Sequence, residues 1–118
     1  MLNVLIVEDE SIVALDLEHK LKLMGFNVNI ARSGEEALKI IGTNKFDLIL
    51  MDVYLNDGLN GIDIAIQIRN DYNTPIIYIT GSRDPSKHEK ISLTEPYAFI
   101  KKPFDEVQLQ EAINCLNP

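Results

Sequence analysis

Five short apolar runs, alternating with longer helical segments, are the feature that most limits the fold of this chain. Each run has the length of a strand and ends at turn or polar residues: 2–7, 28–31, 48–51, 76–79 and 98–100. Parallel strands need long crossover connections, and an almost unbroken apolar strand is typical of a sheet buried on both faces. The alternation therefore predicts a doubly wound α/β fold, in which a parallel sheet has helices on both faces.

The intervening segments predict five helices. The first covers residues 10–24, where apolar side chains recur every three to four positions, and Gly25 stands where it would end. The second starts at Ser33, and Glu36 completes a capping box in which each side chain can satisfy the free backbone N–H of the other. The other three are expected over residues 62–71, 86–93 and 105–116, and the fourth has the least regular pattern.

Composition limits the partners and the compartment. The chain has 118 residues, which suits a single domain over residues 1–118, and its 18 acidic and 11 basic side chains give a net charge of −7. This charge argues against nucleic acid or an anionic membrane as a direct partner and favours a cation. No run approaches the roughly 20 apolar residues of a membrane span. The single cysteine, Cys115, cannot form an internal disulfide, which indicates a reducing compartment such as the cytoplasm.

Polar side chains follow four of the five predicted strands. Glu8 and Asp9 follow the first, Asp52 the third, Thr80 the fourth and Lys102 the fifth. In doubly wound sheets, side chains beyond the carboxyl ends of the strands gather in one crevice where the strand order reverses. Three carboxylates there would raise one another's pKa unless a cation neutralised them, and Mg²⁺ prefers hard oxygen ligands. The pattern predicts a Mg²⁺ site that receives a phosphoryl group, whose oxygens Lys102 and Thr80 would bind.

Each of these residues also has an ordinary structural explanation. Asp52 can start a loop, Glu8 and Asp9 can cap the helix that begins near residue 11, Thr80 can belong to a turn, and Lys102 can be a solvated charge. Coincidence is a poor explanation for five such residues at four strand ends in the same crevice. The functional interpretation therefore depends on the set and not on any one member.

At these residues the sequence resembles the receiver domains of two-component response regulators, over its whole length. Four stretches in this order and spacing carry the resemblance: LIVEDE at 5–10, DLILMD at 47–52, ITG at 79–81 and FIKKPF at 99–104. The resemblance implies the flavodoxin-like (βα)5 form of the fold, with a five-stranded parallel sheet of order 2-1-3-4-5. It also implies a cytoplasmic signalling switch, either as a free-standing relay or as a module of a larger multidomain chain.

The resemblance assigns roles to the residues that match the family motifs. Asp52 would be the phosphoacceptor. Asp9 and Asp52 would bind Mg²⁺ directly, together with the backbone carbonyl of Tyr54, and Glu8 would bind it through water. Lys102 and Thr80 would bind the phosphoryl group.

Two further expectations concern the neighbours of those residues. Gly81 would leave the phosphoryl site open because it has no side chain. The Lys102–Pro103 peptide bond would be cis, which would aim the lysine inward.

The implied chemistry is transfer of a phosphoryl group to Asp52, in line, from the phosphohistidine of a sensor histidine kinase or phosphotransfer protein, or from a small acyl phosphate. The chain would be a phosphoacceptor that assists its own phosphorylation and dephosphorylation, and not an enzyme. Its own histidines, His19 and His88, lie in predicted helices without an acid or hydroxyl partner in the pattern, so we expect them at the surface.

The implied switch couples Thr80 to an aromatic ring on the last strand, Phe99, which would turn inward when Thr80 moves toward the phosphoryl group. Many family members have tyrosine there, so an output state that needs its hydroxyl is in doubt, and Phe99 can also be an ordinary core ring. The loop at 56–61 also departs from the family, since it lacks a proline and places Gly61 one residue later. Phosphoryl lifetime is open for that reason.

The output surface, in family terms, combines the fourth helix, the fifth strand and the fifth helix. It includes the charged residues Lys87, Lys90, Lys101, Asp105 and Glu106. These charges can pair across a homodimer, or they can form a solvated face. The output partner is not indicated by the sequence.

Two other functions fit parts of the pattern. A phosphatase of the haloacid dehalogenase type also uses an aspartyl nucleophile, but it needs a second acid two residues further on, and Tyr54 follows Asp52 and Ser11 follows Asp9 at that spacing. A receiver-like interaction module that is never phosphorylated would keep the fold. The complete set of five site residues argues against such a module, because it would not need them.

Overall fold

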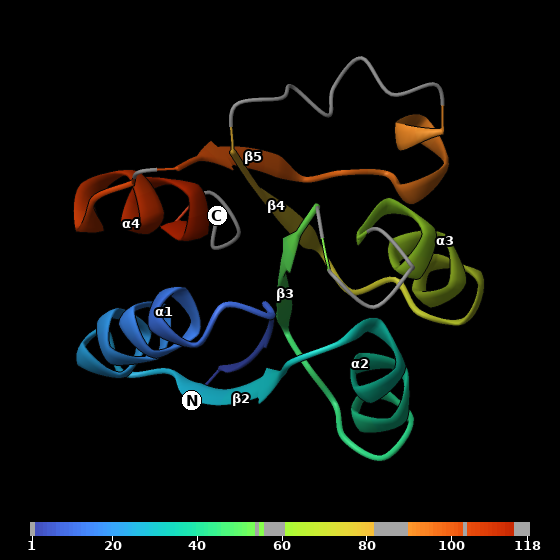
Figure 1. The fold of residues 1–118 in the computed structure, drawn as a ribbon, viewed down its shortest axis with the longest axis horizontal. Coiled ribbons are helices and arrows are strands. Elements are labelled where there is room, and N and C mark those ends of the chain that lie inside the picture. Colours follow the sequence, from blue (N-terminus) through green and yellow to red (C-terminus); the bar gives the residue numbers. More distant parts are fainter. Residues whose placement is uncertain (1, 54, 56–60, 82–89, 103, 115–118) are drawn as a thin grey trace.

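The computed structural model describes residues 2–53, 55, 61–81, 90–102 and 104–114. In this part of the chain five strands form one parallel sheet of order β2-β1-β3-β4-β5 (Figure 1). The strands are β1 Asn3–Val7, β2 Asn27–Ala31, β3 Leu48–Asp52, β4 Ile76–Thr80 and β5 Ala98–Lys101. The predicted sheet and strand order are confirmed. One difference matters for the site: Asp52 and Thr80 are the last residues of their strands instead of the first residues after them.

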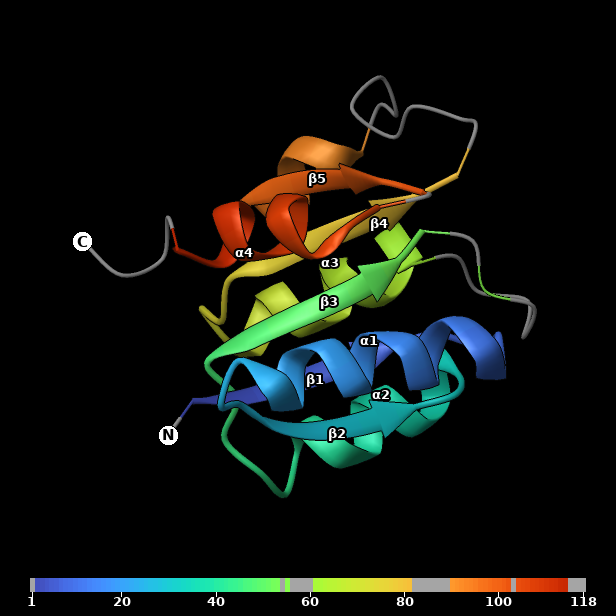
Figure 2. The same ribbon diagram turned by 90° about the vertical axis from the view of Figure 1, so that its left-hand side faces the viewer.

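Helices cover both faces of the sheet, as the alternation predicted. The α-helices of the described residues are α1 Ser11–Leu23, α2 Gly34–Ile41, α3 Gly61–Asp71 and α4 Glu106–Asn114. α1 and α4 lie on one face, and α2 and α3 lie on the other (Figure 1). Figure 2 shows that the strand arrows all point toward the same edge of the molecule, so their carboxyl ends meet there.

The predicted fourth helix needs a correction. Residues 86–89 lie outside the described residues, and the chain from Ile91–Thr94 forms a short 3-10 helix, η2, instead of an α-helix. η2 ends at Glu95, which has a left-handed φ of 48° and precedes Pro96. Because a residue before proline is disfavoured in the helical conformation, the turn cannot continue. The fifth predicted helix is the one labelled α4, and its residues 115 and 116 are not described.

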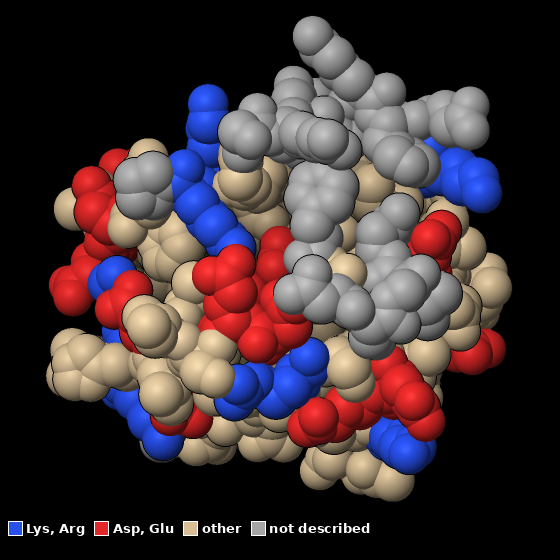
Figure 3. All heavy atoms as spheres, viewed as in Figure 1, with Lys and Arg blue, Asp and Glu red and all other residues tan. Residues whose placement is uncertain are grey.

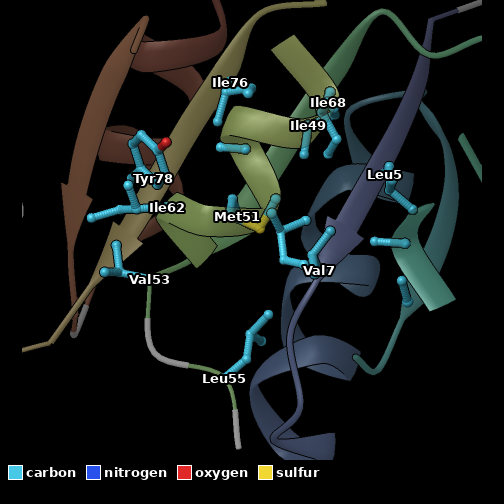
Figure 4. Packing of buried hydrophobic residues seen from close by; sticks show 14 of the residues in the cluster. Leu5, Val7, Ile49, Met51, Val53, Leu55, Ile62, Ile68, Ile76 and Tyr78 are labelled. Carbon is cyan, nitrogen blue, oxygen red and sulfur yellow. The ribbon is translucent and has the colours of Figure 1, made fainter. Parts of the chain in front are cut away.

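Two apolar layers hold the sheet and helices together. β3 and β4 are buried along their whole length, because each has a strand on both sides and helices on both faces. Figure 4 shows the layer beneath α3, an apolar cluster that includes Ile49, Met51, Ile62 and the ring of Tyr78. The edge strands β2 and β5 are partly exposed. This agrees with the sequence, in which the three strands paired on both sides, β1, β3 and β4, contain the unbroken apolar runs 4–7, 48–51 and 76–79.

The predicted helix ends are largely confirmed. Gly25, directly after the C-cap of α1, has a φ of +93°, a conformation that glycine adopts without strain. Ser33 Oγ accepts a hydrogen bond from the Glu36 backbone N–H at 3.1 Å. The second hydrogen bond of the predicted capping box differs, because the Glu36 carboxylate accepts from the Arg32 backbone N–H at 3.3 Å. The donor is thus the residue before Ser33 instead of Ser33 itself. None of the described helices has the length and apolar character that crossing a membrane would require.

Candidate functional site

Three carboxylates meet at the carboxyl edge of the sheet. Glu8, Asp9 and Asp52 each place one carboxylate oxygen within 4.8 Å of the others. They come together because β1 is paired in parallel with β3, with Val7 level with Met51, so the residues after Val7 lie beside the end of β3. Glu8 is 1% exposed and Asp52 is 4% exposed. Figure 3 shows acidic side chains gathered at the centre of this face, with basic side chains above and below them.

Lys102 faces this acidic cluster from the other side. Its Nζ lies 3.3 Å from Glu8 Oε2 and 3.8 Å from Asp52 Oδ2. Its backbone N–H donates to the Thr80 carbonyl at 2.6 Å, which continues the β4–β5 pairing one residue beyond β5. Among the described residues, this one ammonium therefore pairs with two of the three clustered carboxylates.

Burial and, after it, the charge of Asp52 together raise the pKa of Glu8 to about 7, while the Glu10 N–H and Lys102 act in the opposite direction. Glu8 Oε1 accepts a hydrogen bond from the Glu10 N–H at 3.1 Å. Within the described residues, Glu8 Oε2 makes no hydrogen bond and faces only the ion pair with Lys102. A buried carboxylate oxygen in this position, beside two further acids, fits a bound divalent cation.

Thr80 lies at the end of β4, next to this cluster, and is 5% exposed. Side chains alternate along a strand, and Tyr78, two residues earlier, belongs to the apolar layer beneath α3. Thr80 therefore faces the α3 side of the sheet. An added Cβ at Gly81, the next residue, would meet no described heavy atom within 4 Å, which agrees with an open site at this edge.

Phe99 is not a core ring. It is 41% exposed, and it stacks on the buried ring of Tyr78 with centroids 5.7 Å apart and an interplanar angle of 18°. Tyr78 and Phe99 are direct partners in the β4–β5 register. The sequence did not predict that Tyr78 would stack on Phe99. Tyr78 lies inside an apolar run, and Phe99 is 21 positions further along the chain.

Other predicted residues fall outside this arrangement. Several residues named in the sequence analysis lie outside the described residues: Tyr54, the loop at 56–60, Lys87, His88, Pro103 and Cys115. The cis or trans form of the Lys102–Pro103 bond is therefore not described either. His19 is exposed on α1, as expected. Of the charged output residues, Lys90, Lys101, Asp105 and Glu106 are exposed. Asp105 also caps α4, since its Oδ1 accepts from the Gln108 N–H at 2.8 Å.

Gly61 has a role that the sequence did not indicate. Its N–H donates to the Val53 carbonyl at 2.6 Å, and a Cβ built on it would overlap the backbone carbonyl oxygen of Asp52. A glycine is therefore required where α3 begins against the end of β3. The glycine itself was visible in the sequence, but its contact was not.

The whole chain, apart from a few terminal residues, matches one known protein family. The response regulator receiver domain family matches residues 4–114, so the chain belongs to that family. It is thus a receiver domain of a two-component response regulator, and the resemblance inferred from the four motifs is confirmed.

Its relatives include longer regulators. The chain is 36% identical over 118 residues to the response regulator ArlR of Staphylococcus saprophyticus, covering 98% of this chain and 52% of ArlR. It is 35% identical over 114 residues to the phyllosphere-induced regulator PhyR of Methylorubrum extorquens, covering 95% of this chain and 42% of PhyR. The chain spans about half the length of these curated relatives.

Solved structures show the same fold. The N-terminal domain of a response regulator/sensory box/GGDEF 3-domain protein from Carboxydothermus hydrogenoformans matches with a TM-score of 0.90 and 32% identity, over 97% of this chain and 92% of that one. The chemotaxis protein CheY4 of Vibrio cholerae matches with a TM-score of 0.90 and 26% identity, over 98% of each chain. The flavodoxin-like receiver fold expected from the sequence is therefore confirmed.

Proposed function

We propose that this receiver domain is a phosphoacceptor switch in which Asp52 takes a phosphoryl group. The observation that carries this proposal is the position of the Asp52 carboxylate: it is 4% exposed at the end of β3, clustered with two other acids and 3.8 Å from the Lys102 ammonium. The donor would be a phosphohistidine, on a sensor histidine kinase or a phosphotransfer protein, or a small acyl phosphate. The cell compartment would be the cytoplasm.

The residues fit a Mg²⁺ cofactor. Asp9 and Asp52 would bind it directly, with the backbone carbonyl of Tyr54, and Glu8 would bind it through water. The fit rests on the excess of carboxylates over amines and on the buried Glu8 oxygen that has no hydrogen bond among the described residues. When bound, Mg²⁺ supplies positive charge that neutralises the acids and stabilises the phosphoryl oxygens.

The chain's own residues perform the transfer. An Asp52 carboxylate oxygen forms a bond to phosphorus while the bond from phosphorus to the donor's leaving atom breaks, and the leaving atom keeps the electron pair. Lys102 exchanges part of its contact with the carboxylates for the oxygens of the transferred group, and the Thr80 hydroxyl donates a hydrogen bond to them. The domain would thus assist its own phosphorylation and, with water as the attacking group, its own dephosphorylation.

The output step would run from Thr80 to Phe99. Movement of Thr80 toward the phosphoryl group would open space on the α3 side of the sheet, and the exposed ring of Phe99 would turn into it. This would change the surface formed by η2, β5 and α4, which an output domain, a partner protein or a second copy would bind. The exposed charges on that surface include Lys90, Lys101 and Glu106.

The decisive experiment is mass spectrometry after incubation with acetyl phosphate and Mg²⁺. We expect the intact chain to gain the mass of one phosphoryl group and Asp52→Asn to gain none, while Asp16→Asn, which removes an exposed acid paired with Lys20 on α1, behaves like the intact chain. A phosphoryl group that remains in Asp52→Asn would move the acceptor elsewhere. No gain in any protein would favour the interaction module that is never phosphorylated.

A further inference from the structure

A second basic side chain, that of Arg32, lies at the rim of the acidic cluster, on the loop between β2 and α2. Arg32 directly follows Ala31, which is level with Val7 in the β1–β2 register, and the Glu8 backbone N–H donates to the Ala31 carbonyl at 3.0 Å. The Arg32 backbone is therefore beside the Glu8–Asp9 segment at the carboxyl edge of the sheet. Unlike Lys102, Arg32 is exposed.

Arg32 is held at both ends. Its backbone N–H donates to the Glu36 carboxylate at 3.3 Å, and its guanidinium donates to the hydroxyl of Ser11, two residues beyond Asp9. The Ser11 contact directs the guanidinium over the start of α1, next to the acidic cluster, and away from the edge of β2. A long side chain held in this way loses less conformational entropy when it binds a ligand.

The guanidinium also has no acidic partner in the described part of the chain: no carboxylate oxygen there lies within 4.0 Å of it, whereas Lys102 is paired with both Glu8 and Asp52. A guanidinium carries five N–H donors in a planar fork that matches the two oxygens of a carboxylate. The contact with Ser11 uses one nitrogen and Arg32 is exposed, so the fork has further donors to offer a ligand.

In-line transfer determines which part of a donor would meet this rim. Asp52 is buried at the base of the site, so the leaving group must lie on the opposite side of the phosphorus, toward the mouth. With an acyl phosphate, the bond that breaks joins phosphorus to an acyl oxygen, and the departing group becomes a carboxylate. Negative charge thus develops on the side of the site where the guanidinium lies.

We propose that Arg32 binds the acyl leaving group and makes this receiver selective for acyl phosphates among small-molecule phosphoryl donors. The inference rests on the proposed function of Asp52. The new bond is between phosphorus and an Asp52 oxygen, the acyl oxygen keeps the electron pair of the broken bond, and Arg32 pairs with the resulting carboxylate without transferring a proton. A donor whose leaving group is not a carboxylate gains nothing from Arg32 in this way.

The test compares two donors. Acetyl phosphate releases acetate, whereas phosphoramidate releases ammonia. We expect Arg32→Ala to slow phosphorylation by acetyl phosphate about twofold to fivefold, the size of an exposed charge interaction, and to leave phosphorylation by phosphoramidate nearly unchanged. Arg32→Lys, which keeps the charge but not the fork, is expected to fall between Arg32→Ala and the intact chain.

Lys39→Ala is the matched control, because it removes one positive charge from an exposed position on α2 that is paired with Glu35. It is expected to leave the rates with both donors unchanged. Equal slowing of both donors by Arg32→Ala, or no slowing with acetyl phosphate, would overturn the role of Arg32 while leaving the assignment of Asp52 intact. Failure of the intact chain to accept a phosphoryl group from either donor would overturn both.

Discussion

Glu8 combines burial with proximity to another acid, and both act on its protonation. Its carboxyl has a pKa raised to about 7, first by burial and then by the charge of Asp52. Near neutral pH, in the absence of a cation, a proton on Glu8 relieves repulsion within the acidic cluster. A bound cation and this proton are therefore alternative ways of neutralising the same oxygens.

This pKa predicts how the stability of the metal-free protein depends on pH. The unfolded chain releases the Glu8 proton near the ordinary value of 4.5, whereas the folded chain holds it to about 7. Between these values the folded state binds more protons, so raising the pH lowers the free energy of unfolding, on the order of 1–3 kcal/mol for this group. Glu8→Gln should remove most of this decrease, as measured by urea unfolding with a chelator present.

The control for that measurement is Glu35→Gln, which changes an exposed acid on α2. It should keep the pH dependence of the intact chain. If Glu8→Gln retained the full decrease between about pH 5 and pH 8, Glu8 would not be the group responsible.

At the scale of elements, the start of α3 is built tightly against the end of β3. The contact is between backbones: Gly61 donates to the Val53 carbonyl at 2.6 Å and leaves no room for a side chain beside Asp52. The same strand end carries the proposed phosphoacceptor. The position of the Asp52 carboxylate therefore depends on how α3 joins the sheet.

We expect Gly61→Ala to lower the free energy of unfolding by about 2 kcal/mol or more, because the new methyl group would overlap the Asp52 carbonyl and backbone must shift. Gly81→Ala is the matched control, since a Cβ there would meet no described atom, and it should change stability by less than about 0.5 kcal/mol. Chemical denaturation of both variants measures the difference. If the two variants had the same free energy of unfolding, α3 would be able to move away from Asp52 without loss of stability.

The neighbouring strands β4 and β5 connect the site to the surface. β4 carries Thr80 at its end and Tyr78 in its middle, and Tyr78 supports the exposed ring of Phe99 on β5. Burial raises the pKa of Tyr78 to about 12, so this ring stays uncharged at physiological pH. A proposed movement of Thr80 would thus reach the surface through two adjacent strands.

At the scale of the whole molecule, a cation at the acidic cluster would join β1 to β3. A ligand that binds only the folded state raises the free energy of unfolding in proportion to the logarithm of its concentration. At about ten times the dissociation constant, Mg²⁺ should stabilise the intact chain by about 1.4 kcal/mol. Asp9→Ala should lose most of this stabilisation, as measured by thermal unfolding with and without Mg²⁺.

Asp16→Asn serves as the control here, because it removes an acid of α1 that is outside the cluster. It should be stabilised by Mg²⁺ as much as the intact chain. An equal effect of Mg²⁺ on Asp9→Ala would remove Asp9 from the direct ligands and point to screening by surface charge.

Much of the fold was predictable because its signals are local. Each strand is an apolar run, each long helix has a 3.6-residue pattern, and Gly25 and Ser33 mark helix ends through their own backbone and side-chain chemistry. The strand order and the family also followed from short motifs that keep their spacing. The weakest helical pattern, at 86–93, was the one that proved wrong where it is described, since η2 is a 3-10 turn ended by Glu95 and Pro96.

The local pattern also predicted which acids and which lysine would reach the carboxyl edge, because parallel strands end on the same side of a sheet. It could not predict the ion pairs of Lys102, the stacking of Phe99 on Tyr78, the backbone contact of Gly61 or the anchoring of Arg32 by Ser11. Each of these joins residues on different elements, and register and packing between those elements set the distance. Such contacts form only when the whole chain has folded, which is why no single stretch of sequence contains them.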